Sequence, residues 1–138
     1  MQLAVSKAVS YIYLGAGFVR NAVADLFTLR LARAYAGGAL LLNILGWIAA
    51  WLIGRPLGDG LAVLHYNVIF GIDLVGDPIR LFLMPLFALI VLIMNYLFMA
   101  VLFNRRDRLF AHIWLGSAAA MNGFMLVAMY FIYLVNFS

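Results

Sequence analysis

Three long segments without a charged residue determine what this chain can fold into. Residues 34–54, 81–104 and 109–138 contain no Asp, Glu, Lys or Arg. At a rise of about 1.5 Å per residue, about twenty apolar residues in a helix span the roughly 30 Å hydrocarbon core of a lipid bilayer. The sequence therefore predicts an all-α membrane protein with three transmembrane helices, at residues 34–54, 81–104 and 109–137.

The composition agrees with a chain that lies almost entirely in the membrane. Its 138 residues are 68% hydrophobic and 10% charged, whereas soluble domains are about 45–50% apolar and about 25% charged. We expect a single membrane domain over residues 1–138. The absence of cysteine excludes disulfides, iron–sulfur clusters, thiolate zinc sites and cysteine nucleophiles, and no cofactor is predicted.

The basic residues stand at the ends of the predicted spans and indicate an orientation. The connection at residues 55–80 has two basic and three acidic residues, and the side that holds the N-terminus and the connection after residue 104 has seven basic residues: Lys7, Arg20, Arg30, Arg33, Arg105, Arg106 and Arg108. Because basic residues stay in the cytoplasm, we expect the N-terminus inside and the C-terminus outside. The net charge of +4 is then a topology signal, and no nucleic-acid partner is expected.

Residues 1–33 are predicted to form an amphipathic helix in the inner membrane interface. Val9, Val23 and Phe27 fall on one side of such a helix, and polar residues fall on the other. The segment resembles a secretory signal, but Arg20 and Asn21 stand where a signal has a neutral cleavage region. Two glycines, Gly15 and Gly17, offer a place for a break. Two roles remain open, an anchor for the bundle or a helix that docks a partner.

Each predicted span carries one asparagine near its middle. Asn43 lies ten residues after Arg33, Asn95 ten before Arg105, and Asn122 ten after His112. If the helices cross nearly straight, the three amides lie at a similar depth, and an amide in hydrocarbon needs a hydrogen-bonding partner. We expect them to join the helices. The alternative is a polar path for a ligand or ion, although no intramembrane charge accompanies it.

Small residues recur near these asparagines at helical spacing, as Gly46, Ala50 and Gly54 in the first span and Gly116, Ala120 and Gly123 in the third. Such stripes let helix backbones approach closely, either within one chain or between chains. Met121, Met125 and Met129 form a further stripe, and thioethers bind Cu(I). Methionine is also a flexible core filler, so we expect packing and no metal.

The connection at residues 55–80 is too apolar for a free aqueous loop and too polar for a span. We expect residues 61–75 to fold over the outer end of the bundle or to lie among the headgroups, with glycines at the turns. Its polar residues are predicted to form a hydrogen-bonded cap: His65, Tyr66, Asn67, Asp73 and Asp77. One histidine with two aspartates is a weak metal signal, and no nucleophile for catalysis is apparent.

A resemblance covers the same region. The run His65-Tyr66-Asn67, followed by Phe70-Gly71-Ile72-Asp73 and a span with Pro85 and Asn95, resembles a pattern in short uncharacterised bacterial inner-membrane proteins. The resemblance implies a location in the bacterial inner membrane. It implies no catalytic residues.

The sequence favours a non-catalytic accessory or scaffold subunit of a larger bacterial membrane complex. Its expected partners are the lipid bilayer and other membrane subunits or further copies of itself. The alternative function is a small transporter or channel component whose path is lined by the asparagines. An enzyme is the least favoured class.

Overall fold

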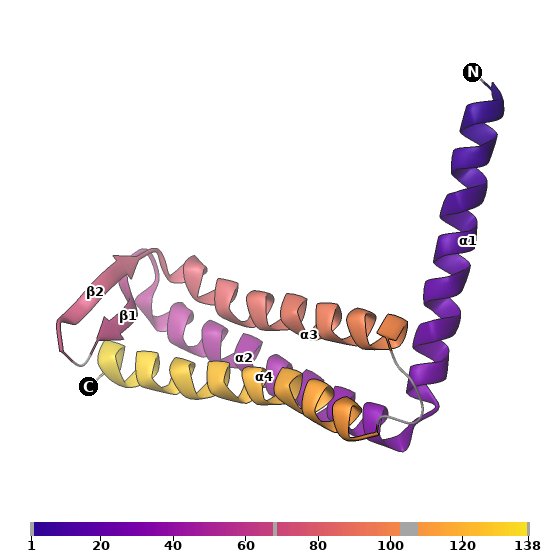
Figure 1. Ribbon diagram of the computed structural model, residues 1–138. Helices are drawn as coiled ribbons and strands as arrows, with labels where there is room; N and C mark the ends of the chain where they lie inside the picture. Colours follow the sequence, from indigo (N-terminus) through magenta and orange to yellow (C-terminus); the bar gives the residue numbers. More distant parts are fainter. Residues whose placement is uncertain (1, 68, 103–107, 138) are drawn as a thin grey trace.

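The computed structural model describes residues 2–67, 69–102 and 108–137, and most of them are helical. Along the chain the elements are α1 (Gln2–Phe27), α2 (Arg30–Leu57), β1 (Ala62–Asn67), β2 (Gly71–Gly76), the 3-10 helix η1 (Pro78–Phe82), α3 (Leu83–Leu102) and α4 (Arg108–Phe137). Helices α2, α3 and α4 lie side by side, the strands close one end of this bundle, and α1 leaves the other end crosswise (Figure 1).

Three helical segments are long and apolar enough to cross a membrane, which confirms the predicted number of spans. They are Arg30–Leu57, Pro78–Ala100 and Leu109–Phe137. The first is longer than the predicted 34–54, so Arg30 and Arg33 lie within α2. The predicted inner connection with Arg105 and Arg106 lies outside the described residues.

Two hydrogen bonds fix the register of α2 against α3. The Asn43 side-chain nitrogen donates to the Pro85 carbonyl at 2.9 Å, and the Tyr96 hydroxyl donates to the Ala32 carbonyl at 2.8 Å. Ala32 lies eleven residues before Asn43, and Tyr96 lies eleven residues after Pro85. The two helices therefore run antiparallel, and the two contacts have the same spacing on each helix. Helix α4 runs parallel to α2, because Tyr35 contacts His112 and the later Asn43 contacts the later Asn122.

Helix α2 buries its small side chains and exposes its large ones. The residues on its buried face recur at three- and four-residue steps: Ala32, Ala36, Ala39, Asn43, Gly46, Ala50 and Ile53. Leu41, Ile44 and Leu52 on the other side are more than half exposed. The exposed face of large apolar side chains is suited to contact with lipid. The buried face of small side chains allows the close helix packing that is typical of membrane proteins.

Helix α1 runs without a break through Gly15 and Gly17 and ends at Phe27. The Thr28 hydroxyl donates to the Asp25 carbonyl at 2.6 Å in the turn that separates α1 from α2. The fully buried Leu26 packs with Met99 and Ala100 of α3 and attaches this end of α1 to the bundle. Helix α1 runs crosswise to the other three helices (Figure 1).

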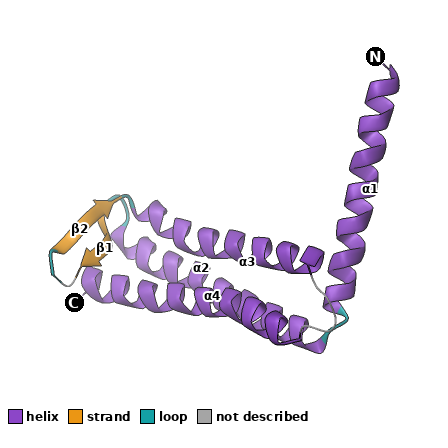
Figure 2. Cartoon of the chain, in the orientation of Figure 1, coloured by secondary structure: helices purple, strands orange, loops and turns teal. Residues whose placement is uncertain are grey.

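The connection between the first two spans is an antiparallel β-hairpin (Figure 2). The sequence predicted a folded segment with turns here but no strands. Strands β1 and β2 pair from Ala62 opposite Gly76 to Asn67 opposite Gly71, with an irregularity at His65. Gly71 has a φ of 79°, which L side chains rarely adopt. The hairpin lies over the ends of the helices.

Candidate functional site

The polar centre of the bundle is a junction of three helices around Asn43. This side chain donates to the Asn122 side-chain oxygen of α4 at 3.0 Å and to the Pro85 carbonyl of α3 at 2.9 Å. Its own oxygen accepts from the Trp47 indole at 3.0 Å. Asn122 donates in turn to the Ala118 carbonyl at 3.0 Å. Asn43 and Asn122 are almost fully buried, so this network satisfies both amides inside the protein.

Asn95 does not take part in this junction. Its amide donates to the Val91 carbonyl of its own helix at 2.8 Å. Asn43 contacts α3 at Pro85. Asn95 lies ten residues, or about 15 Å, further along α3 than Pro85. The pair Tyr96 and Ala32 places it near the level of Arg33 instead. The expected belt at one depth therefore contains Asn43 and Asn122 but not Asn95.

The small residues of α2 lie where the other helices approach most closely. A Cβ added to Gly46 would lie 3.4 Å from the Pro85 side chain, and one added to Gly54 would lie 3.7 Å from Pro78. Ala50 is fully buried in the cluster that contains Leu81 and Met129. This stripe is used inside the chain.

The stripe of α4 divides between interior and surface. Gly116 faces the ring of Tyr35, whose hydroxyl lies 3.3 Å from the His112 Nδ1, and Gly123 faces Leu42. Ala120 is exposed. Helix α2 therefore packs against the α4 stripe at Gly116 and Gly123, and Ala120 lies at the surface.

The junction encloses very little space. A void of about 10 Å³ is bordered by both asparagines and by Gly46 and Pro85. One water molecule needs about 10–15 Å³. This void is therefore at most large enough for about one water molecule.

The hairpin brings His65 and Asp73 together across its two strands. The His65 Nδ1 and the Asp73 Oδ1 are 2.6 Å apart, and both side chains are substantially exposed. Opposite Tyr66 stands Ile72. Asp77 instead caps η1 by accepting from the Ile79 backbone nitrogen at 2.9 Å.

Asn67 holds the turn of the hairpin from within. Its side-chain oxygen accepts from the backbone nitrogens of Ile69 at 2.8 Å and Phe70 at 3.4 Å. The side chains of these two residues are 83% and 81% exposed. An apolar tip, defined as Ile69 and Phe70, is therefore exposed at the end of the bundle, with both backbone nitrogens bonded to Asn67.

Asn136, which the sequence analysis did not single out, attaches the hairpin to α4. Its side chain accepts from the Val63 nitrogen and donates to the Val63 carbonyl, both at 2.9 Å. The amide thus pairs with β1 as a neighbouring strand would. An asparagine in the last turn of a span was the available signal, but sequence alone does not identify its partner.

Metal-binding side chains do not gather among the described residues, where no three of His, Asp and Glu lie together. Of the methionine stripe, Met129 is buried and packs near Gly46, and Met121 and Met125 are half-buried. Comparisons with protein-family models, with curated proteins and with solved structures found no match.

Proposed function

We propose that this protein is a non-catalytic accessory or scaffold subunit of a larger complex in the bacterial inner membrane, with its N-terminus in the cytoplasm. The observation that carries the proposal is the apolar tip. Ile69 and Phe70 are the most exposed large apolar side chains among residues 13–67, 69–100 and 109–137. Asn67 accepts hydrogen bonds from both of their backbone nitrogens, so less backbone entropy would be lost when a partner binds.

The hairpin behind the tip is secured on two further sides. His65 pairs with Asp73 between the strands, and Asn136 ties β1 to α4. An isolated two-stranded hairpin is marginally stable in water, so these contacts keep it folded. Aromatic anchors on rigid supports are typical centres of protein interfaces.

The closed interior favours this proposal over a small transporter or channel component. Both buried asparagines have partners within the protein, and the void beside them measures about 10 Å³. A transport path would need a larger polar cavity at that depth.

Purification from native membranes tests the proposal. In mild detergent, the tagged full-length chain should retain a stoichiometric membrane partner, identified by quantitative mass spectrometry. Phe70→Ser should lower the partner yield at least tenfold, since truncating a central aromatic anchor costs about 2 kcal/mol or more. Leu61→Ser is the matched control, because Leu61 is 71% exposed at the base of the hairpin.

Two results would contradict the proposal. One is a wild-type protein that purifies alone as a closed oligomer with a central pore. The other is a partner retained equally by Phe70→Ser and Leu61→Ser. Helix content and thermal unfolding of both variants, measured in the same detergent, show whether the bundle itself is unchanged.

A further inference from the structure

We propose, on the basis of the proposed scaffold function, that the free edge of β2 binds an extended apolar segment of the partner protein as a third strand. Asn136 of α4 bonds to β1, and β2 lies farther from the helices than β1 does (Figure 1). Among the described residues, no backbone hydrogen bond joins β2 to an element other than β1. The outer edge of β2 is thus unpaired in this part of the chain.

The contact with Asn136 shows which backbone groups of β2 face this edge. Both the nitrogen and the carbonyl of Val63 bond to Asn136, so they point away from β2. Val75 stands opposite Val63, and opposite residues of an antiparallel pair either bond to each other or both face outward. The N–H and C=O of Val75 therefore face the free edge. Backbone groups alternate along a strand, so those of Asp73 face the same edge.

The side chains of β2 leave its outer edge unprotected. Edge strands of soluble proteins are commonly protected by proline or by charged side chains, especially lysine. Strand β2 contains no Pro, Lys or Arg, and the carboxylate of Asp73, its one charged residue, contacts His65 of β1. Ile72, Leu74 and Val75 are 53%, 48% and 45% exposed. This edge is therefore suited to the addition of a strand.

The backbone of β2 specifies the kind of partner. Donors and acceptors that recur at every second residue are matched together by another extended chain, which is how strand addition recognises peptides. Leu74 and Val75 are exposed on opposite faces of β2, so the bound segment should carry apolar side chains on both of its faces. The apolar tip directly precedes β2 in the chain. A partner that contacts Ile69 and Phe70 therefore reaches this edge next.

A second copy of this chain fits the edge less well. Two copies in one membrane share their orientation, and a symmetric pair is related by a two-fold axis along the helices. Such an axis aligns two strands antiparallel when the strands are perpendicular to it. Strand β2 runs obliquely to the helices (Figure 1). A segment of another protein is free of this restriction.

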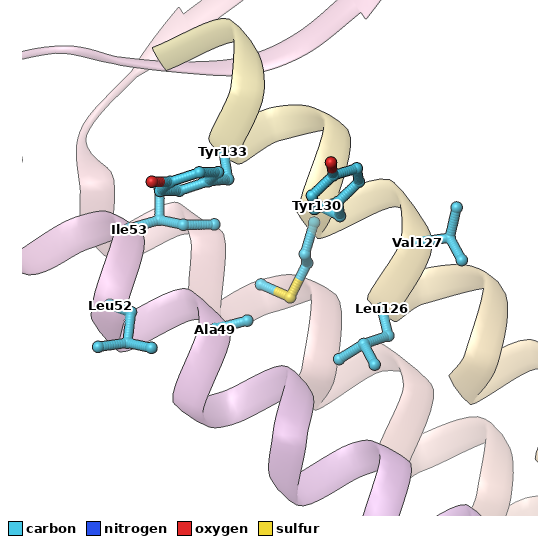
Figure 3. Close-up of a pocket in the computed structure, with 8 residues that line it drawn as sticks. Ala49, Leu52, Ile53, Leu126, Val127, Tyr130 and Tyr133 are labelled. Carbon is cyan, nitrogen blue, oxygen red and sulfur yellow. The ribbon is translucent and has the colours of Figure 1, made fainter. Parts of the chain in front are cut away.

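The groove between α2 and α4 does not specify an occupant in the same way. Figure 3 shows that its lining consists of large apolar side chains, Ala49 and the rings of Tyr130 and Tyr133. A lipid chain and an apolar helix both fit such a surface. The free edge of β2 differs because its backbone groups have a direction and a repeat.

Proline at position 75 tests the edge in the full-length protein, purified from native membranes in mild detergent. Val75→Pro removes an N–H that faces outward, and proline is tolerated on edge strands at such positions. The partner yield should fall about tenfold or more, since a bond is lost and the ring blocks the approach of a strand. Val75→Thr is the matched control, because it keeps the N–H and a β-branched side chain, and it should retain the partner.

Hydrogen exchange of the free variants shows whether residues 62–67 remain folded. If Val75→Pro retained as much partner as Val75→Thr, strand addition would be wrong.

Exchange in the unsubstituted protein decides the question if the proline unfolds the hairpin. The amides of Asp73 and Val75 should exchange about tenfold more slowly in the complex than in protein separated from its partner. The amide of Leu74 faces β1 and should change little. Equal exchange of Val75 in the two samples would overturn the proposal.

A photoreactive residue placed at Ile72 identifies the occupant. Crosslinks should fall on one contiguous apolar segment of the partner, and crosslinks to a second copy of this chain or to lipid would overturn the proposal. The failure of the proposed function is a separate result. A partner that Phe70→Ser loses and Val75→Pro keeps would refute strand addition alone, whereas a wild-type protein that purifies alone would refute the scaffold function as well.

Discussion

Asn43 is the residue on which the polar centre of the bundle depends. It donates to Asn122 and to the Pro85 carbonyl and accepts from Trp47. Asn43→Leu keeps a similar volume but removes all three bonds, and buried bonds in membrane proteins average about 0.6 kcal/mol each. We expect a loss of about 2 kcal/mol in the free energy of unfolding, measured by denaturation in mixed micelles.

Asn95→Leu is the matched control for this prediction. The Asn95 amide bonds only to Val91 of its own helix among the described contacts. The same substitution there should change the free energy of unfolding by less than about 0.5 kcal/mol, because no contact between helices is lost. Equal losses in the two variants would contradict a special role of the junction.

The three asparagines show what residue spacing can predict. Counting from the flanking charges located Asn43 and Asn122 at one level because α2 and α4 are parallel and begin at similar depths. It misplaced Asn95 because the neighbouring Tyr96 meets Ala32, next to Arg33, and α3 continues past that contact to Leu102. Depth along one helix follows from sequence, whereas the offset between helices depends on packing.

At the scale of elements, the hairpin depends on Asn136 of α4. This side chain bonds both backbone groups of Val63 and also donates to the Ile132 carbonyl at 2.8 Å. Asn136→Leu should leave the bundle folded but raise the hydrogen-exchange rate of residues 62–76 about tenfold, since two bonds that hold β1 are lost. Exchange measured by mass spectrometry checks this.

Tyr130→Leu is a suitable control for the hairpin experiment. Tyr130 is 58% exposed on α4, and among the described residues no hydrogen bond joins it to the strands. Exchange in the hairpin should match the wild type in this variant. If Asn136→Leu exchanged no faster than Tyr130→Leu, the hairpin would not depend on this amide.

The hairpin was only partly predictable from sequence. A composition too apolar for a free loop and too polar for a span left two positions open, over the bundle end or among the headgroups. The strands were not predicted, because each has six residues and pairs with an irregularity at His65 that interrupts the alternation of sides. The contact of His65 with Asp73 arises from that pairing, which no spacing along the chain specifies.

At the scale of the whole molecule, the central helix α2 turns small and polar side chains inward and large apolar ones outward, and buried leucines and methionines of α3 and α4 complete the core. The buried face of α2 consists mostly of alanine, glycine and asparagine, while Leu41 and Leu52 are exposed. Such a distribution would be unfavourable in water. In a bilayer the large apolar side chains contact lipid, and the polar side chains find hydrogen-bonding partners inside the protein. The uncharged segments predicted the spans for the same reason.

The orientation of this molecule is testable because the chain has no cysteine. Leu61→Cys places a thiol at an exposed position beside the hairpin, and Asn21→Cys places one on the exposed side of α1. With seven basic residues on the α1 side, a membrane-impermeant maleimide should label Leu61→Cys in intact cells. It should label Asn21→Cys only after the membrane is opened. The reverse pattern would place the hairpin and its apolar tip in the cytoplasm, and any partner of the tip would then have to be sought there.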